Sequence, residues 1–387
     1  MPLLGQGGFF IPQHARHVDL PFEYSNNFII LTLNCNGLLP LKFIFDTGAE
    51  HTVISKREIT DAMRLTYERE YRMKGSDLKT ELIAYLVRRV RFEMPDRIVA
   101  PALDVLVLQE DYFRFEEYAG VNVHGILAAG AFSKYSIKIN YQRRVMTLYE
   151  REGYSPQSAG FTPVPVQVLR NKPYLSTVLH IRPEAQAPVK LLVDTGAGLS
   201  LLLFTNTDSL LHPPPNAIAS NIGMGLGGFL EGYTGRVQAL HLGEFRQNAV
   251  ITYFQTLDST QDLAQLNQRN GLIGNVLLDR FQVVFDYIGE RMWLKPAKSY
   301  HEAYIFDRSG MNIIAAGDNF NVYTINHILP ASPAAEAGLQ RGDVLLKVGR
   351  SPTLLMTLSD VQRAFQKAPG KKVGVTVRRN GVRIKTE

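Results

Sequence analysis

The tetrapeptide Asp-Thr-Gly-Ala occurs twice in this chain, at residues 46–49 and 194–197, each time after a run of bulky apolar residues. A carboxylate beside buried strands costs free energy unless its neighbours satisfy it, so two such sites favour one working pair over two unrelated acidic β-turns. Two carboxylates that face each other closely cannot both ionise, and they hold one proton between them at mild pH. Such a pair can activate a water molecule and protonate a leaving amine.

The repeat extends well beyond the two motifs. A candidate strand precedes each motif, at residues 28–33 and 174–179. After each motif comes a short segment that begins with Gly and continues with Ile and Leu, and it leads into a strand that ends in Tyr, over residues 125–141 and 271–287. Self-similarity of this kind indicates a duplicated supersecondary unit, and it predicts two equivalent lobes.

The run Asp-Thr-Gly-Ala-Glu-His-Thr-Val-Ile, which begins at Asp46, resembles the signature of aspartic peptidases of the retroviral type. The resemblance implies a mainly β, two-lobed (duplicated) aspartic-protease β-barrel fold. It implies that Asp46 and Asp194 are the catalytic residues and that no metal or organic cofactor is needed. It further implies that the residues after each aspartate support the two active-site loops: Thr47, Gly48, Ala49, Thr195, Gly196 and Ala197.

Two departures within the repeat lead to expectations. Pepsin-like enzymes usually carry Ser or Thr where this chain has Ala49 and Ala197, and a hydroxyl there would stabilise the ionised carboxylates, so we expect a pH optimum less acidic than that of pepsin. In the family, an aliphatic-aliphatic-Gly segment packs against each catalytic loop. Lobe two has Leu272-Ile273-Gly274, whereas Ala128-Ala129 stands inserted before Gly130 in lobe one, which predicts a different support for that loop.

Such enzymes also close a β-hairpin flap over the substrate. The glycine-rich run at residues 223–232 fits this role, because glycine allows positive φ and close approach of the backbone to a ligand. A simple glycine-rich surface turn is the alternative. Lobe one offers only residues 74–77 in a charged stretch, so we expect an asymmetric cleft with one dominant flap. The flap residues that we assign are Gly225, Gly227, Gly228 and Phe229.

A different module begins near residue 299. Ser332 can cap a helix that starts at Pro333 and ends before Gly338, and Thr357 with Asp360 can form a capping box for a second helix. The run Ser-Pro-Ala-Ala-Glu-Ala-Gly-Leu-Gln-Arg-Gly-Asp-Val-Leu resembles a bacterial PDZ domain, which implies a small α+β fold. PDZ domains bind extended peptides by adding them to the edge of a sheet.

The PDZ resemblance also suggests which residues bind a peptide. They are the loop residues Gly310, Met311, Asn312 and Ile313 and the groove-helix residues Leu358, Val361 and Phe365. Asn312 stands where such domains often have Gly, and the helix residues could equally be a packed core face. From Tyr300 onward there are twelve Lys and Arg against seven Asp and Glu, so +5 of the chain's formal charge of +6 lies here. A basic surface attracts carboxylate termini, nucleic acid or anionic lipid, and a merely solvated basic face is the further alternative.

Composition restricts the remaining chemistry. Cys35 is the only cysteine, which excludes an internal disulfide and leaves no zinc ligand set, and we expect it to be buried. The histidines show no metal-ligand spacing, and His51 is expected to be a loop residue rather than a partner of the aspartates. No basic-aromatic pattern indicates nucleic acid as a partner. No apolar run approaches the ~18 residues of a membrane span.

Residues 1–6 are too few for a signal peptide. Related bacterial proteases with a C-terminal PDZ domain often carry an export signal, so the resemblance suggests a periplasmic or other extracytoplasmic location, with a cytoplasmic one as the alternative.

We expect three domains, which are an N-terminal protease lobe, a C-terminal protease lobe and a PDZ domain, at residues 1–155, 156–298 and 299–387. The expected function is that of an aspartic endopeptidase that hydrolyses polypeptides. The PDZ domain would bind a peptide tail or the chain's own cleft, either delivering substrate or inhibiting. A monomer would suffice, because both aspartates belong to one chain. The alternative is a catalytically silent scaffold that binds peptides with its lobes and PDZ domain.

Overall fold

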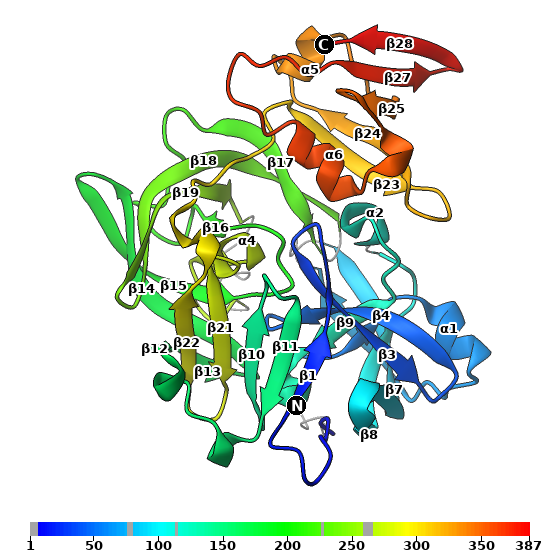
Figure 1. Cartoon of the computed structure of the whole chain (residues 1–387), viewed down its shortest axis with the longest axis vertical. Helices are drawn as coiled ribbons and strands as arrows, with labels where there is room; N and C mark the ends of the chain where they lie inside the picture. Colours follow the sequence, from blue (N-terminus) through cyan, green and yellow to red (C-terminus); the bar gives the residue numbers. More distant parts are fainter. Residues whose placement is uncertain (1–6, 76–79, 113–114, 226–227, 258–265) are drawn as a thin grey trace. The chain divides into compact units, whose positions relative to one another are not determined.

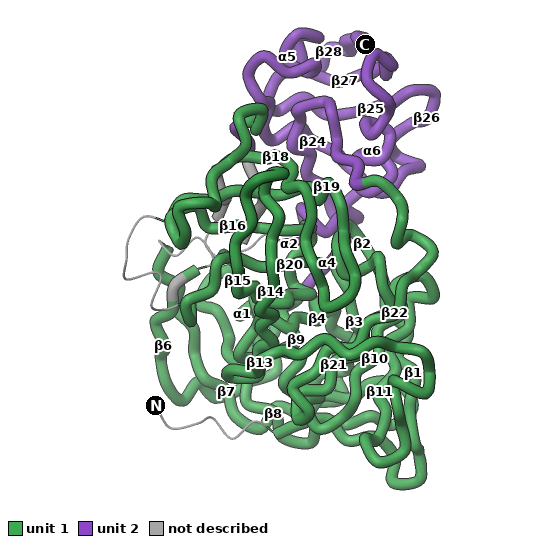
Figure 2. Tube along the Cα trace, turned by 90° about the vertical axis from the view of Figure 1, so that its left-hand side faces the viewer, with its two compact units in different colours: residues 1–113, 124–218, 222–303 green, residues 114–123, 219–221, 304–387 purple. Residues whose placement is uncertain are grey.

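The computed structural model describes residues 7–75, 80–112, 115–225, 228–257 and 266–387. Contacts divide the chain into two compact units, drawn in green and purple in Figure 2. The first unit holds both lobes and consists of residues 1–113, 124–218 and 222–303. The second unit holds the C-terminal module together with two short pieces of lobe sequence, and it consists of residues 114–123, 219–221 and 304–387.

Lobe one is a strongly curved sheet. Its strands are Glu23–Ser25 (β2), Phe28–Cys35 (β3), Leu39–Asp46 (β4), Val53–Ile54 (β5), Arg69–Lys74 (β6), Glu81–Met94 (β7), Ile98–Leu108 (β8) and Gly125–Ala128 (β9). They lie in the order β2-β3-β4-β9-β5-β8-β7-β6, and an additional pairing of β3 with β7 closes the sheet on itself. Cys35 is fully buried in β3, as the sequence predicts.

Lobe two repeats this arrangement. Its strands are Gln167–Leu169 (β13), Lys172–Arg182 (β14), Ala185–Val193 (β15), Leu201–Phe204 (β16), Ile218–Gly225 (β17), Gly228–Leu242 (β18), Phe245–Gln255 (β19) and Gly271–Ile273 (β20). The order β13-β14-β15-β20-β16-β19-β18-β17, with β14 also pairing β18, matches lobe one strand for strand. The predicted duplication and mainly β fold class are therefore confirmed.

A third sheet joins the two lobes (Figure 1). Its strands are His17–Pro21 (β1), Ser136–Asn140 (β10), Val145–Tyr149 (β11), Thr162–Pro165 (β12), Phe281–Asp286 (β21) and Arg291–Pro296 (β22). In the order β1-β11-β10-β21-β22-β12, the lobes meet where Ile137 pairs with Phe285 and Ile139 with Val283. All four side chains are at most 1% exposed, so this seam is part of the hydrophobic core. Among the described residues of this unit, Arg57–Ala62 (α1) and Asn275–Leu278 (α4) are α-helices.

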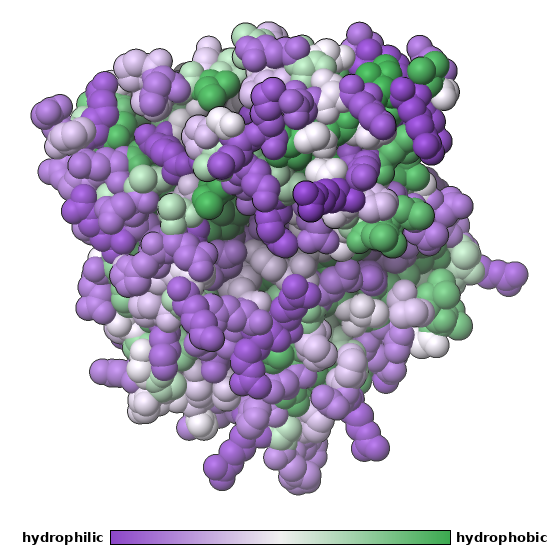
Figure 3. Space-filling model, turned by 45° about the horizontal axis from the view of Figure 1, so that its top comes forward, coloured by the Kyte–Doolittle hydropathy of each residue, from purple (hydrophilic) through white to green (hydrophobic). Residues whose placement is uncertain are grey.

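The strands form where apolar residues alternate with polar ones, because successive side chains of a strand point to opposite faces. In β1, for example, Val18 and Leu20 are buried while their neighbours are exposed. Polar and charged side chains cover most of the face drawn in Figure 3, with apolar residues scattered among them. Among the described residues, no helix is both long and apolar enough to cross a membrane.

The C-terminal module is a small sheet with two helices against it. Its elements are Met311–Ala316 (β23), Val322–Ile328 (β24), Pro333–Glu336 (α5), Val344–Val348 (β25), Ser351–Pro352 (β26), Leu358–Ala364 (α6), Val375–Arg379 (β27) and Val382–Thr386 (β28). The order is β23-β24-β25-β27-β28, and β26 pairs with β25. The same unit contains Phe115–Ala119 (α2), which comes from lobe-one sequence.

The helix caps that the sequence predicts are present. The Ser332 hydroxyl accepts a hydrogen bond from the Ala335 amide at the start of α5, and Gly338 has a φ of 73° after its end. Thr357 and Asp360 form the predicted capping box of α6. These short-range signals fix the helix ends because each one satisfies backbone groups that the helix itself leaves unpaired.

Candidate active site

Each motif aspartate lies at the end of a central strand. Asp46 is the last residue of β4, and Asp194 directly follows β15. The amides of Gly48 and Ala49 donate to Asp46 Oδ1 at 2.6 and 2.9 Å, and the amide of Gly196 donates to Asp194 Oδ1 at 2.8 Å. Each turn therefore holds its own carboxyl group in a fixed orientation.

Besides burial, the neighbouring Asp194 carboxyl group raises the pKa of Asp46, so the two groups lie close together. The glycines of the two turns make this approach possible. A Cβ placed on Gly48 would lie 2.7 Å from Asp194 Cγ, and one on Gly196 would run into the Asp46 carboxyl group. Any side chain at either position would therefore push the aspartates apart.

Two threonines connect the loops to each other. The Thr47 amide donates to Thr195 Oγ1 and the Thr195 amide donates to Thr47 Oγ1, both at 3.0 Å. The Thr47 hydroxyl donates to the carbonyl oxygen of Val193 at 2.6 Å, and the Thr195 hydroxyl donates to that of Phe45 at 2.9 Å. Both threonines are fully buried, so water does not compete for the four hydrogen bonds that link the lobes next to the aspartates.

The environment gives the two carboxyl groups different proton affinities. Burial, reinforced by the charge of Asp194, holds the pKa of Asp46 well above its usual range. Burial also raises the pKa of Asp194, but the positive charge of Arg269 and, more weakly, of Lys172 opposes this rise. Since the pair cannot ionise twice at mild pH, it holds one shared proton and one negative charge.

Arg269 is a buried cation that acts on Asp194 electrostatically and that the sequence did not reveal. It precedes β20, its Cζ lies 5.8 Å from the centre of the Phe204 ring, and its Nε is buried without a hydrogen-bond partner among the described residues. Burial lowers the pKa of its guanidinium, and the charge of Asp194 opposes that change. Lys172, the other cation that acts on Asp194, has its Nζ 3.8 Å from Glu50 Oε2. No motif surrounds Arg269, so the sequence holds no signal that would have found it.

The aliphatic segments behind the loops correct one expectation. In lobe one, Asp46 pairs with Ala128 in the register of β4 and β9. In lobe two, Val193 pairs with Ile273, and the Asp194 amide donates to the carbonyl oxygen of Ile273, so Asp194 lies opposite Gly274. Ala128 thus takes the place of Gly274, and the prediction that residues are inserted in lobe one is wrong. Lobe two requires glycine because a Cβ on Gly274 would run into the carbonyl oxygen of Ala197.

Asn275, the next residue, is a second site residue that sequence reasoning missed. Its buried side-chain amide donates to the carbonyl oxygens of Thr195 at 2.6 Å and Asn27 at 2.8 Å, and its oxygen accepts from the Tyr141 hydroxyl at 2.8 Å. It therefore ties the lobe-two catalytic loop to lobe one. Comparison of the two repeats could have found it, because the equivalent position in lobe one is Ala129.

Replacing Asn275 by Ala is expected to lower the free energy of unfolding by about 3 kcal/mol, since it removes two buried hydrogen bonds, with Thr195 and Tyr141, and a partly buried one with Asn27. We also expect kcat/KM to fall by roughly 10²-fold, because the Thr195 loop loses its fixed position. Urea unfolding and peptide cleavage assays measure the two effects. Asn140→Ala, which removes a side-chain bond to Gln282 away from the loops, is the control. Equal effects of both substitutions would contradict the role given to Asn275.

Hairpins are present in both lobes. β17 and β18 are neighbours in the lobe-two sheet, with Gly225 at the end of the first and Gly228 and Phe229 at the start of the second. Gly227 lies outside the described residues. β6 and β7 occupy the equivalent place in lobe one, where Lys74 pairs with Glu81. Lobe one therefore builds its hairpin from paired strands without a run of glycines, and the expectation of one dominant flap stays a prediction.

The PDZ residues named from the sequence lie around β23 and α6. Gly310 has a φ of 75°, which glycine adopts without strain. Most of the others belong to the buried core: Met311, Ile313, Leu358, Val361 and Phe365. Asn312 instead accepts a hydrogen bond from Asn326 at 3.4 Å.

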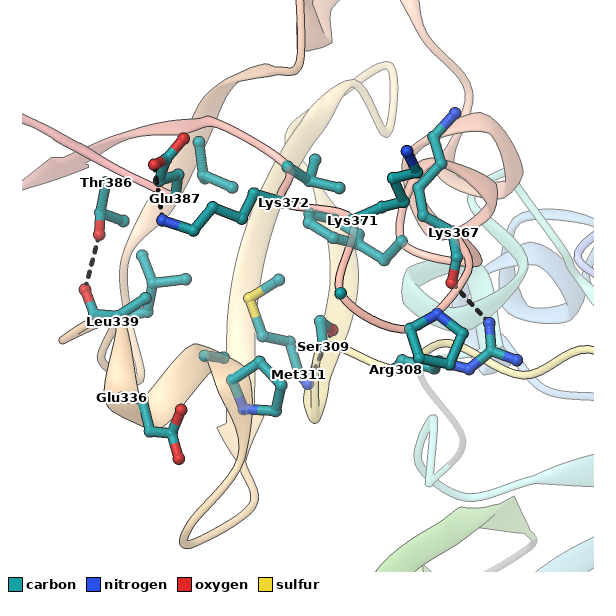
Figure 4. A pocket seen from close by; sticks show the side chains of 18 of the residues that line it. Arg308, Ser309, Met311, Glu336, Leu339, Lys367, Lys371, Lys372, Thr386 and Glu387 are labelled. Atoms are coloured by element: carbon teal, nitrogen blue, oxygen red, sulfur yellow. Dashed lines mark hydrogen bonds and ion pairs between the residues drawn. The ribbon is translucent and has the colours of Figure 1, made fainter.

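A cavity of about 610 Å³ lies beside Met311 in this module (Figure 4). Arg308, Lys367, Lys371 and Lys372 contribute to its lining. Arg308 donates to the carbonyl oxygen of Lys367 at 2.6 Å, and Lys372 pairs with Glu387 at 2.9 Å. An apolar cavity rimmed by these cations suits a small apolar group next to a carboxylate.

Family models match two parts of the chain. Residues 31–129 match the aspartyl protease family, and residues 324–379 match the PDZ domain family. No curated protein gives a significant match. Similar solved structures include an aspartic proteinase from Irpex lacteus (11% identity, 74% of this chain and 99% of that one, TM-score 0.47). Others are basic 7S globulin from soybean (9%, 74% and 97%, 0.44) and conglutin gamma from lupine seeds (10%, 74% and 97%, 0.46).

The family match covers the strands and the Asp-Thr-Gly turn of lobe one, and lobe two repeats the same sheet order around the second turn. The chain therefore carries an aspartyl protease domain with two barrel lobes, followed by a C-terminal PDZ domain.

Proposed function

We propose that this chain is an aspartic endopeptidase in which Asp46 and Asp194 activate a water molecule. The observation that carries the proposal is the close approach of the two buried aspartates across the two turns, which only glycine at positions 48 and 196 allows. We assign the shared proton to Asp46 and the negative charge to Asp194, because Arg269 and Lys172 oppose the rise in the pKa of Asp194. Aspartic peptidases use such a pair, because one member then serves as a base while the other serves as an acid.

In the proposed reaction the Asp194 carboxylate takes a proton from water as the water oxygen adds to the scissile carbonyl carbon. The Asp46 carboxyl group donates a hydrogen bond and then its proton to the carbonyl oxygen, which gives a tetrahedral diol. Asp194 then gives the proton that it took from water to the leaving nitrogen. The C–N bond breaks as a diol hydroxyl returns its proton to Asp46, which releases an acid and an amine and restores the singly protonated pair. The threonine bonds and Asn275 hold the carboxyl groups in position during these steps.

We also propose polypeptides as substrates, with the hairpins β6–β7 and β17–β18 as the covers of the cleft. We further propose that the two protease lobes and the PDZ domain span residues 1–155, 156–298 and 299–387. The cations beside the Met311 cavity support the binding of a peptide carboxylate by the PDZ domain.

A proteome-derived peptide library incubated between about pH 3 and pH 8 tests the proposal. We expect internal cleavage of peptides, incorporation of one heavy oxygen into the new carboxylate from labelled water, and no acyl-enzyme that hydroxylamine can trap. A trapped acyl-enzyme would contradict direct attack by water. Absence of cleavage at every pH, also after removal of residues 304–387, would favour the peptide-binding scaffold.

Replacement of Arg269 by Met is expected to narrow the pH profile of kcat/KM. Arg269 lowers the pKa of Asp194, and Asp194 must be ionised to act as the base, so loss of the charge raises this pKa. The acidic limb of the profile then moves to higher pH, while the alkaline limb, set by Asp46, moves little. Arg170→Met, which removes an exposed arginine paired with Glu50, is the control. An unchanged acidic limb, or a maximum for the parent chain near about pH 2, would contradict the assignment.

A further inference from the structure

A short helix of lobe-one sequence packs against the PDZ domain within the second unit. α2 lies between β8 and β9 in the chain, yet it packs against β23 within the second unit (Figure 1). Ala119, at its end, is fully buried. The Tyr118 hydroxyl accepts a hydrogen bond from Asn326 Nδ2 at 3.4 Å, and this Nδ2 lies equally far from Asn312 Oδ1. Asn312 and Asn326 thus connect the helix to two strands of the sheet.

β23 is the strand at which a PDZ domain takes its peptide. It is the last strand in the sheet order and pairs only with β24 among the described strands, so its other edge can accept an added strand. α6 packs against the same strand and forms the second wall of the groove. The segment that contains α2 reaches both walls, because Tyr118 lies on the sheet and Gly120 lies on Leu358, the first residue of α6.

Gly120 makes the close approach to α6 possible. Its φ is 70°, its amide donates to the carbonyl oxygen of Glu116 at 2.8 Å, and so it ends α2 in a left-handed conformation. A Cβ at this position would lie 2.9 Å from the Cβ of Leu358, which is closer than side chains tolerate. A larger residue would therefore separate the segment from α6.

We propose that the groove between β23 and α6 is an internal docking surface whose resident ligand is the segment of residues 115–123. A free peptide can add to β23 only when this segment leaves, so the apparent affinity for peptides is lower than that of the open groove. Asn312 supports this proposal, because its Oδ1 and the Tyr118 hydroxyl both accept from Asn326 Nδ2. Glycine at position 312, where PDZ domains often have it, would lack this contact.

Hydrogen–deuterium exchange of the full chain tests the docking, with Asp194→Asn in every version to prevent self-cleavage. In Gly120→Val we expect residues 115–123 and 311–316 to exchange faster together, by about tenfold. Gly338→Val is the matched control, since Gly338 has a similar φ of 73° in the same unit but no atom within 4 Å of an added Cβ. Unchanged exchange of β23 in Gly120→Val, or equal changes in both variants, would overturn the proposal.

Fluorescence anisotropy then tests the competition. The probe is a labelled decapeptide with an aliphatic last residue and a free carboxylate, titrated into the same full-length chains. We expect binding about tenfold tighter for Gly120→Val than for Gly338→Val. Asn326→Ala, which loosens the docking without touching lobe-one sequence, is expected to change the affinity in the same direction. Equal affinities, or no binding to any variant, would overturn the proposal. Neither readout requires proteolysis, so the outcome is independent of the proposed protease function.

Discussion

Replacement of Asp194 by Asn is expected to lower kcat/KM for peptide hydrolysis by roughly 10⁴-fold or more. The amide has nearly the shape of the carboxyl group and can still accept the hydrogen bond from the Gly196 amide. It cannot take a proton from water, so the base of the proposed mechanism is lost while the fold is kept. Asp46→Asn is expected to have a similar effect, because it removes the acid of the pair. Initial rates on one cleaved library peptide measure both.

Asp279→Asn is the matched control for these substitutions. Burial raises the pKa of Asp279 to about 7, and this carboxyl group accepts from the Tyr24 hydroxyl rather than facing another aspartate. If loss of any buried carboxyl group impaired the enzyme, this variant would be equally slow. We expect it to retain most of the activity. Activity of Asp194→Asn within about tenfold of the parent would exclude the proposed pair as the source of catalysis.

Much of the fold and the central pair could be predicted because their signals are local and repeated. The two Asp-Thr-Gly-Ala turns each follow a strand, and the cap residues Ser332 and Thr357 stand next to the helices that they start. Each of these signals depends on a few consecutive residues. The duplication then allowed one lobe to be used as a check on the other.

The residues that escaped prediction act over long distances in the chain. Asn275 bonds to Asn27 and Tyr141, which only the folded chain brings near it. Arg269 acts on Asp194 through a low-dielectric interior, and no spacing rule in a sequence encodes such an electrostatic effect. The docking of residues 115–123 on β23 joins segments that no periodicity relates. Direct comparison of the two repeats would have found only Asn275, through its alanine counterpart.

Removal of the hydrogen bonds between Thr47 and Thr195 is expected to lower both stability and activity. Thr195→Val keeps the shape of the side chain but removes the hydroxyl that accepts from the Thr47 amide and donates to the Phe45 carbonyl oxygen. Each partner then loses a buried hydrogen bond, which is expected to cost about 2–4 kcal/mol of unfolding free energy. The loops also lose their fixed spacing, so kcat should fall by roughly 10²-fold. Urea unfolding and cleavage rates measure the two losses.

Thr195→Ser distinguishes the contribution of the hydroxyl from that of the methyl group. Serine keeps both hydrogen bonds and loses one buried methyl, so we expect a cost of about 1 kcal/mol and nearly normal kcat. If Val and Ser variants were equally unstable, packing rather than hydrogen bonding would hold the lobes together at this point. If only the Val variant lost activity, the four bonds between Thr47, Thr195 and the strand ends would set the distance between the aspartates. The sharing of one proton between Asp46 and Asp194 would then depend on hydrogen bonds made by two uncharged threonines.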